Sequence, residues 1–285
     1  MKRNLKLFVS LFLVIFSLLS CALLCACNGT ELPSENENGT TASIDILKIG
    51  KADCIIINTG KNIVMIDTGE AENVYYIKSF MASRGYQKID TLILTHYDKD
   101  HIGGASEIIK AYKPNRVFES KRVDLQQIYA DYHEEINSLG CDLYKLFSNR
   151  TFELDGMEFE IDIPKKSKYS EKNDNNSSLV ISVKYGENKL LFCGDAMELR
   201  LEELIDENIG GYDFVKLPYH GNYIDNYEEF LGLVNPSAVA ITNSKKNPTD
   251  TKTVELLSQL QINAYETRYG DINICLDGKE LIINQ

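Results

Sequence analysis

Residues 95–104 of the chain read THYDKDHIGG, and this stretch decides the fold that we expect for the whole protein. It follows TLIL (91–94), a short continuous apolar run that is typical of a strand buried on both faces. Strand ends that face a cleft are where α/β folds place ligand groups. Alternate side chains of an extended stretch share a face, so His96 and Asp98 are expected to reach one metal ion.

The same loop continues with a second pair of ligand residues. Asp100 and His101 are expected to turn toward a neighbouring metal position, and Gly103 and Gly104 allow the next helix to begin close by. Crowded carboxylates repel one another, and a divalent cation removes that conflict. The alternative is a surface loop with chance histidine and aspartate content. Because both histidines lie in frame after a buried strand, we favour the metal loop.

Two later strand ends carry the same residue types. Asp195 follows an apolar run and a glycine, where a carboxylate is well placed to bridge two metal ions; its alternative role is to cap the helix expected at 197–208. His220 ends the segment DFVKLPYH and precedes a glycine, and we favour a role in the site over a purely structural one. His133 lies among acidic residues in YADYHEEIN and is expected at the surface.

Apolar runs and turn residues along the chain predict the order of strands and helices. Strands are expected in 44–50, 54–60, 62–69, 91–96, 151–154, 157–163, 178–186, 189–195, 213–221, 237–243, 272–278 and 279–285. Helices are expected in 72–85, 104–112, 124–139, 197–208, 226–234 and 250–260. Both halves begin with β-hairpins and continue into β–α units. This predicts one domain of the α/β (α+β) class, with two packed sheets and helices outside.

The N-terminus has the composition of an export signal over residues 1–26, with three basic residues before a long apolar run. It ends in LCAC (24–27), which resembles a bacterial lipobox and implies lipidation of Cys27. The protein would then be anchored on the outer face of the bacterial cytoplasmic membrane. The alternatives are an uncleaved N-terminal membrane helix and a weaker lipidation site at Cys21. Residues 27–42 are expected to form a flexible polar tether, and 43–285 the folded domain.

Charge and cysteine content limit the function classes. The whole chain has a net charge of −12; without the signal it keeps 27 basic and 42 acidic side chains, a net charge of −15. Such a chain has no general electrostatic footprint for nucleic acid. Cys54, Cys193 and Cys275 lie in apolar runs without any CxxC pair, so buried free thiols are expected.

The order of motifs, IDTG, THxDxDHIGG, LLFxGD and KLPxHG, is similar to that of the metallo-β-lactamase-like hydrolases, and resembles in particular the ComEC type of competence-protein domain. The resemblance extends from about Ile44 to the C-terminus. It implies a four-layer αβ/βα sandwich with a cleft for two divalent metal ions, zinc or manganese. The positions that match metal-site motifs are His96, Asp98, Asp100, His101, Asp195 and His220. Asp67 in IDTG matches a position that supports these ligands from behind.

The chain departs from the family pattern at three places. Residues 175–178, NNSS, stand where typical members have a histidine, Tyr219 stands where this branch has the first histidine of HHG, and no histidine precedes Pro248. Fewer imidazoles make the expected site rich in oxygen ligands, which favours Mn²⁺ or Mg²⁺ beside Zn²⁺.

The resemblance implies a metal-dependent hydrolase whose substrate is a phosphodiester or related phosphoester, either a small molecule or nucleic acid. Asp100 is expected to orient the attacking water and His220 to bind metal or donate a proton. Tyr219 and Lys216 border the same strand end and are expected to stabilise negative charge. The alternative is a non-catalytic, membrane-anchored lipoprotein that uses the fold to bind metal, DNA or a partner. No protein partner is inferable.

Overall fold

The computed structural model describes residues 42–122, 126–166, 169 and 175–285, which belong to one compact unit, Asn38–Gln285. The expected signal, Cys27 and the tether up to residue 41 lie outside the described residues. The first strand begins at Ala42, one residue before the expected start of the domain. None of the described helices is both long and apolar enough to cross a membrane.

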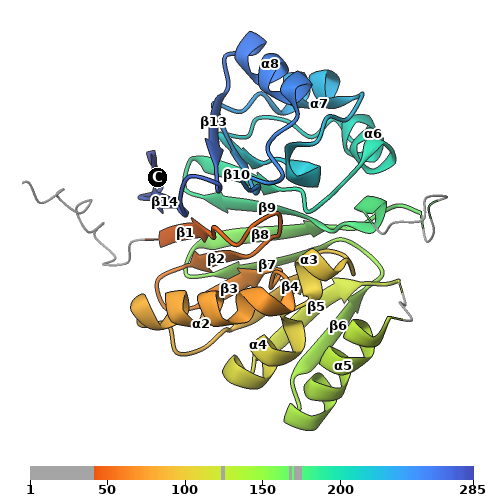
Figure 1. The fold of residues 1–285 in the computed structure, drawn as a ribbon, viewed down its shortest axis with the longest axis vertical. Helices are drawn as coiled ribbons and strands as arrows, with labels where there is room; N and C mark the ends of the chain where they lie inside the picture. Colours follow the sequence, from red (N-terminus) through yellow and green to blue (C-terminus); the bar gives the residue numbers. More distant parts are fainter. Residues whose placement is uncertain (1–41, 123–125, 167–168, 170–174) are drawn as a thin grey trace, which may run out of the picture. The chain divides into compact units, whose positions relative to one another are not determined.

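The first sheet has eight strands in the order β15-β14-β1-β2-β3-β4-β5-β6 (Figure 1). Its strands from β15 through β14, β1 and β2 to β3 pair in antiparallel orientation, and those from β3 to β6 pair in parallel. The strands are β1 (Ala42–Ile46), β2 (Ile55–Asn58), β3 (Ile63–Ile66), β4 (Thr91–Leu94), β5 (Arg116–Ser120), β6 (Asp142–Leu146), β14 (Ile272–Leu276) and β15 (Leu281–Asn284).

The second sheet has seven strands in the order β13-β12-β11-β10-β9-β8-β7. Strands β7 to β10 are antiparallel, and β10 to β13 are parallel. The strands are β7 (Arg150–Leu154), β8 (Met157–Asp162), β9 (Val180–Tyr185), β10 (Asn188–Phe192), β11 (Phe214–Lys216), β12 (Ala238–Ile241) and β13 (Asn263–Glu266).

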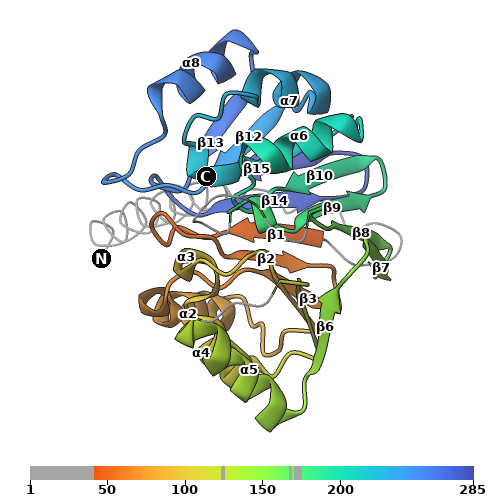
Figure 2. The ribbon, with the colours of Figure 1, turned by 90° about the vertical axis from the view of Figure 1, so that its right-hand side faces the viewer.

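Helices cover the outer face of each sheet, so that the described unit has four layers (Figures 1 and 2). The first sheet is covered by α2 (Val74–Ser83), α4 (Ala105–Tyr112) and α5 (Gln127–Leu139). The second is covered by α6 (Glu198–Asp206), α7 (Tyr227–Val234) and α8 (Thr251–Gln259). The predicted four-layer αβ/βα sandwich is therefore confirmed.

The inner faces of the two sheets form one apolar core between them. Ile44 and Ile93 of the first sheet belong to the same buried cluster as Phe159 and Phe192 of the second. On the outer faces, alternate residues of the same strands pack against the helices, as the two-residue period of a strand requires. The packing brings the carboxyl ends of the parallel strands of both sheets, β3, β4, β10 and β11, to one edge.

The sequence pattern missed three strands. The segments of β5, β6 and β13 read RVFES, DLYKL and NAYE, and none contains the continuous apolar run or strict alternation that marks a strand. Each is parallel to a neighbour that the pattern did predict or to another missed strand. Their strand conformation is therefore set by pairing within the sheet and not by local composition.

Candidate metal centre

The loop 95–104 begins where β4 ends and folds back as a single helical turn, α3 (Lys99–Ile102), with Asp98 at the position before the turn. His96 and His101 are both fully buried, and their ring centroids lie 4.1 Å apart. A Cβ atom added at Gly104 would lie 2.6 Å from the Thr68 carbonyl oxygen. The second glycine of the motif is therefore needed for close approach of the loop to the end of β3.

The second sheet supplies two further groups to the same place. Asp195 follows β10, and His220 lies in the turn η3 (Pro218–Gly221) after β11. His220 Nε2 lies 3.1 Å from Asp195 Oδ2 and 3.5 Å from Asp100 Oδ2. His101 Nε2 lies 3.4 Å from Asp195 Oδ1. Four of the predicted residues thus gather around one point, although up to 120 positions separate them in the sequence.

His96 and Asp98 form the other side of the centre. His96 Nε2 lies 3.8 Å from Asp98 Oδ2, in agreement with the extended conformation expected between them. Asp98 is about one-third exposed, whereas His96 is fully buried. All six residues expected to bind metal therefore lie at this edge of the two sheets.

Hydrogen bonds at Nδ1 turn the three imidazoles so that Nε2 faces the centre. His101 Nδ1 lies 2.7 Å from Asp67 Oδ2, and His220 Nδ1 lies 2.9 Å from the Thr242 carbonyl oxygen. His96 Nδ1 lies 3.1 Å from Thr95 Oγ1. The Thr95 hydroxyl donates to Asp67, so its oxygen accepts the Nδ1 proton of His96. Because Nδ1 is engaged in this way, Nε2 of each ring faces the centre and is the atom that can bind a metal ion once any proton on it has been displaced.

The centre contains buried polar atoms that the described residues do not satisfy. The Nε2 atoms of His96, His101 and His220 and Oδ1 of Asp195 have no hydrogen-bond partner among the described residues. Buried polar groups are nearly always paired, so this set of unpartnered ligand atoms fits a cation. Asp100, His101, Asp195 and His220 each offer a ligand atom, and these atoms lie within 4.8 Å of one another.

The charges of the centre shift the pKa values of its members. Burial alone lowers the pKa of an imidazole, but the carboxylates of Asp195 and Asp67 outweigh it and raise the pKa of His101 well above its ordinary value. Burial, together with the neighbouring His101, lowers the pKa of His96 well below its ordinary value. Burial opposes ionisation of Asp195, yet the imidazoles around it keep its pKa well below the usual range.

Asp67 lies behind the ligands, as the motif comparison implies. It is fully buried, has a left-handed backbone (φ 58°), and accepts hydrogen bonds from the backbone and the hydroxyl of Thr95. Together with its contact to His101, these bonds fix the beginning and the end of the metal loop. A non-glycine residue in this conformation is uncommon and marks a place where tertiary contacts hold the backbone.

Two charged residues behind the centre form a buried ion pair. This pairing was not predicted from the sequence. Asp53, just before β2, is 1% exposed, and Lys216, the last residue of β11, is fully buried. Lys216 Nζ forms an ion pair with Asp53 and donates a hydrogen bond of 3.0 Å to the Gly194 carbonyl oxygen. Lys216 is therefore not available to a substrate, contrary to the expectation from sequence. The acid within the run ADCIII was the signal for Asp53.

The segment that stands in place of the missing histidine is η2 (Asn175–Ser177) and the residue after it. Ser178 Oγ lies 3.4 Å from His96 Nδ1 and accepts a hydrogen bond of 3.1 Å from the Asp195 backbone. Fully buried Arg200 donates to the Ser178 carbonyl oxygen, and its own backbone N–H donates to Asn176. The segment thus supports two predicted ligands by hydrogen bonds.

The turn that carries His220 has an unusual backbone. Tyr219, His220 and Gly221 all have left-handed φ values, of 51°, 53° and 77°. The Tyr227 hydroxyl donates a hydrogen bond of 2.6 Å to the Pro218 carbonyl oxygen, and this bond ties the first residue of the turn to α7. Burial and the nearby carboxylates, Asp195 first among them, raise the pKa of Tyr219, so its phenol stays protonated beside the centre.

His133 differs from its expected surface position. Its Nε2 lies 3.0 Å from Oε2 of Glu119, a fully buried residue of β5, and its side chain is 19% exposed. The Tyr132 hydroxyl also donates to Glu119, at 2.6 Å. His133 is therefore the partner of a buried carboxylate under α5. The prediction that Cys54, Cys193 and Cys275 are free thiols is confirmed, and the first two are buried as expected, but Cys275 is only half-buried.

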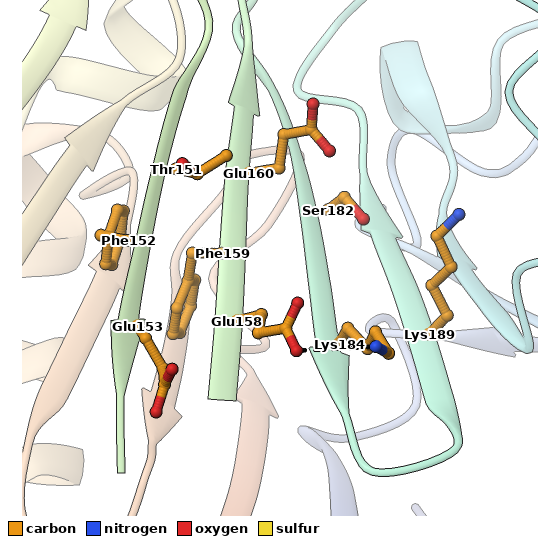
Figure 3. Close-up of a pocket in the computed structure, with 9 residues that line it drawn as sticks. All are labelled: Thr151, Phe152, Glu153, Glu158, Phe159, Glu160, Ser182, Lys184 and Lys189. Atoms are coloured by element: carbon orange, nitrogen blue, oxygen red, sulfur yellow. Dashed lines mark ion pairs between the residues drawn. The ribbon is translucent and has the colours of Figure 1, made fainter. Parts of the chain in front are cut away.

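A cavity of about 420 Å³ lies on the outer surface of strands β7 to β10, away from the metal centre (Figure 3). Its wall carries charges of both signs, and Glu158 and Lys184 form an ion pair of 3.5 Å across it. Charged residues at alternate positions are ordinary for the solvated face of a sheet. We assign no part of the candidate site to this cavity.

Comparisons with known proteins agree with the geometry. A family model described as "Metallo-beta-lactamase superfamily" matches residues 48–240. The chain is 29% identical over 218 residues to "Recombination protein 2" of Haemophilus influenzae, covering 73% of this chain and 25% of that protein. It is 25% identical over 252 residues to "ComE operon protein 3" of Bacillus subtilis, covering 79% and 31%. The chain thus spans a quarter to a third of these relatives.

Solved structures share the fold at low sequence identity. The metallo-beta-lactamase fold protein YhfI from Bacillus subtilis has a TM-score of 0.56 at 9% identity, covering 86% of this chain and all of that one. CmlA, a diiron beta-hydroxylase from Streptomyces venezuelae, has a TM-score of 0.54 at 17% identity, covering 81% and 54%. These similarities show the fold alone.

Proposed function

This chain belongs to the metallo-beta-lactamase superfamily, and on that premise we propose that it is a metal-dependent hydrolase of a phosphodiester or related phosphoester. Members of this fold are mostly metallo-hydrolases. The observation that carries the proposal is the convergence of His101 Nε2 and His220 Nε2 on the carboxylate of Asp195. Neither atom has a hydrogen-bond partner in the described part of the chain, and the same holds for the buried Nε2 of His96. The relation to competence proteins supports the ComEC-like branch.

The residues present fit two divalent cations. One would be held by Asp100, His101, Asp195 and His220, and the other by His96 and Asp98. Three imidazoles and three carboxylates make an oxygen-rich set that suits Zn²⁺ or Mn²⁺. When bound, such cations lower the pKa of a coordinated water and polarise the oxygens of the scissile group.

Three side chains around the cations have separate roles in the proposed reaction. Burial opposes ionisation of Asp100, but its contact with His220 outweighs burial and holds its pKa below the usual range. The ionised carboxylate accepts a hydrogen bond from the attacking water and orients it. Tyr219, kept protonated beside the centre, donates a hydrogen bond to the developing negative charge of the substrate. His220 binds a cation through Nε2 while Thr242 fixes its ring.

The substrate class follows from charge and from the names of the relatives. Oxygen-rich sites suit phosphoryl oxygens, and two curated relatives are named a recombination protein and a competence protein, which supports nucleic acid or a fragment of it. The net charge of −12 disfavours a tight, processive grip on a polyanion. We therefore propose a small phosphoester or a short nucleic-acid end as the substrate.

A substrate screen tests the proposal. The full-length chain, purified in detergent and loaded with Mn²⁺ or Zn²⁺, is offered bis-p-nitrophenyl phosphate, single-stranded DNA and nitrocefin. We expect cleavage of a phosphodiester, its loss in Asp100→Asn and Asp195→Asn, and parent-like activity in Lys99→Ala, whose side chain is 69% exposed. Turnover that persists in Asp195→Asn, or cleavage of nitrocefin alone, would refute the assignment.

A second candidate is a non-catalytic lipoprotein that uses the fold to bind metal, DNA or a partner. The residues at the three positions that lack family histidines favour it, namely those at 175–178, Tyr219 and Asn247. Metal analysis of the purified chain, combined with the substrate screen, separates the two. Two bound equivalents with phosphodiester cleavage support the hydrolase, whereas no bound metal, or bound metal without cleavage of any probe, supports the binding module.

We further propose that the protein is exported and anchored through Cys27 to the outer face of the bacterial cytoplasmic membrane, although this segment lies outside the described residues. Incorporation of labelled palmitate by the parent chain, and its absence in Cys27→Ser, tests the anchor. Equal labelling of the two chains would refute it, and unlabelled membrane-bound parent would indicate the uncleaved helix instead.

A further inference from the structure

We propose that Asp53 and Lys216 are positioning residues: their buried ion pair joins the two sheets behind the metal centre and orients its ligands. The ligands concerned are His101, His220 and Asp195. The inference rests on the proposed function only in taking these three residues as metal ligands. It concerns the binding of metal and holds whatever substrate the protein cleaves.

The carboxylate of Asp53 lies near the Nδ1 atoms of His101 and His220, whereas the Nε2 atoms of these two rings face the metal centre. Its Oδ1 lies 3.6 Å from His220 Nδ1, and its Oδ2 lies 3.9 Å from His101 Nδ1. A carboxylate on the Nδ1 side of an imidazole favours the tautomer with hydrogen on Nδ1 and makes Nε2 a better metal ligand. One fixed negative charge thus acts on ligands that come from both sheets.

The backbone of Asp53 is tied to the metal loop as well. Its N–H donates to the Asp100 carbonyl oxygen at 3.1 Å, and its own carbonyl oxygen accepts from Gly69 at 2.8 Å. Asp53 therefore cannot move without moving the loop that carries the predicted ligands. This makes the carboxylate a fixed reference point for both imidazoles.

Lys216 acts on the third ligand. Its Nζ lies 3.8 Å from Asp195 Oδ1 and donates to the carbonyl oxygen of Gly194, the residue before Asp195. The ammonium thus holds the end of β10 while it neutralises Asp53. Because Asp53 lies just before β2 of the first sheet and Lys216 ends β11 of the second, the pair sets the distance between the two groups of ligands.

The same contacts explain why a second acidic cluster needs no metal. Asp53, Asp67 and His101 offer ligand atoms within 4.8 Å of one another. However, Asp53 is paired with the Lys216 ammonium, and Asp67 accepts hydrogen bonds from His101 and Thr95. The Lys216 ammonium therefore supplies the positive charge of this cluster, and it does so whether or not metal ions are present.

A set of three variants tests the proposal: Asp53→Asn, Lys216→Met and the double variant Asp53→Asn/Lys216→Met, each in the full-length chain in detergent. Removing one partner leaves a buried charge unpaired, whereas replacing both with neutral groups is often tolerated. We therefore expect the single variants to unfold at lower urea concentration than the parent in metal-free form. The double variant should recover most of that loss.

The decisive measurement is metal binding by the double variant. A pair that only stabilises the fold would leave Co²⁺ affinity and the visible Co²⁺ spectrum as in the parent once stability is recovered. A positioning pair predicts affinity weakened by roughly 10- to 100-fold and an altered spectrum. Parent-like affinity and spectrum in the double variant overturn the proposal, and so does failure of all three variants to fold, which would show a structural role.

Asp45→Asn/Arg84→Met is the matched control. It removes another ion pair with a buried acid, 2.8 Å long and 1% exposed at Asp45, that does not contact the centre. Its Co²⁺ affinity should equal that of the parent, and an equal loss would show that metal binding follows general stability and overturn the proposal. Failure of the proposed function would instead appear in the parent, as bound metal without hydrolysis of any probe.

Discussion

At the residue scale, the two halves of the centre are unequal. The side formed by Asp100, His101, Asp195 and His220 has four converging ligand atoms from three buried residues and one partly exposed residue. The side of His96 and Asp98 has only these two ligands, 3.8 Å apart between His96 Nε2 and Asp98 Oδ2. Coordination by more pre-arranged ligands gives tighter binding, because less ordering is left to be done when the ion enters.

We therefore expect one tight and one weak equivalent of Mn²⁺ or Zn²⁺ when the metal-free chain is titrated by calorimetry. Asp98→Asn should remove the weak equivalent and keep the tight one. Asp100→Asn should weaken the tight equivalent by roughly 10-fold or more. Two equivalents of equal affinity, both lost in Asp98→Asn, would contradict this ranking.

The imidazoles of the tight side give metal binding a defined pH dependence. Burial opposes the charge of His220, but Asp195 and Asp100 outweigh it and raise its pKa, as carboxylates also do for His101. In the metal-free protein these protonated imidazoles contribute stability that is complete below the ordinary pKa of 6.5. That contribution is lost as the pH rises through the raised pKa values.

Metal affinity should change in the opposite direction, because a cation must displace those protons. We expect the free energy of unfolding of the metal-free chain to fall as the pH rises above the ordinary imidazole pKa of 6.5, while metal affinity rises over the same range. Urea unfolding and calorimetric titration at several pH values measure the two. Metal affinity that is flat with pH would show that the imidazoles bind no proton in the metal-free state.

At the scale of elements, the turn η3 carries a ligand on a backbone that few sequences adopt. Three consecutive residues with positive φ, two of them not glycine, cost free energy that the surrounding contacts must supply. The bond from the Tyr227 hydroxyl and the two bonds from Asn222 to the Tyr219 carbonyl oxygen are such contacts. The turn is thereby held ready for binding before a metal ion arrives.

Gly221→Ala tests this arrangement. Gly221 has φ 77°, and a Cβ atom would lie 2.7 Å from a methyl group of Ile241, so we expect a loss of roughly 1–3 kcal/mol of stability and weaker metal binding. Gly232→Ala, inside α7 with no atom within 4 Å of an added Cβ, is the control and should stabilise by about 0.5–1 kcal/mol. The free energy of unfolding of both variants, measured by denaturant without metal, tests these expectations.

At the scale of the whole described unit, the centre exists because two sheets pack through one core. Phe159 on β8 and Phe192 on β10 lie in that core with residues of the first sheet, and β10 ends three residues before Asp195. Packing between the sheets therefore sets the distance between the metal loop and its partners from the second half. Loss of core packing should reach the site through loss of folded protein, since no ligand lies in the core itself.

Phe159→Ala should cost about 3–5 kcal/mol, because the side chain is 1% exposed and its removal leaves a cavity. Phe147→Ala, at a side chain that is 74% exposed, should change stability by less than about 0.5 kcal/mol. Metal at 100 times its dissociation constant should return about 2.7 kcal/mol to both. Thermal unfolding with and without chelator measures this; a chelator without effect would indicate that the folded chain binds no metal.

Much of the fold could be predicted from the sequence, because local patterns of apolar and turn residues determine local structure. The apolar run before His96 predicted a buried strand, the glycines after His101 predicted a close turn, and the alternation of β and α segments predicted two sheets with outer helices. The mixed segments of β5, β6 and β13 carried no such pattern. Their strand conformation comes from neighbours in the sheet, and only the folded chain supplies those neighbours.

The site divides in the same way. The metal-binding residues of the loop 95–104 could be predicted from sequence, because histidine, aspartate and glycine occur there within ten positions at the end of one strand. The partnership of Asp53 with Lys216 joins residues 163 positions apart, and that of His133 with Glu119 depends on how α5 lies on its sheet. By itself the sequence determined which chemistry was present. Which charges neutralise one another was decided only when packing brought distant segments into contact, because ion pairing depends on distance in space.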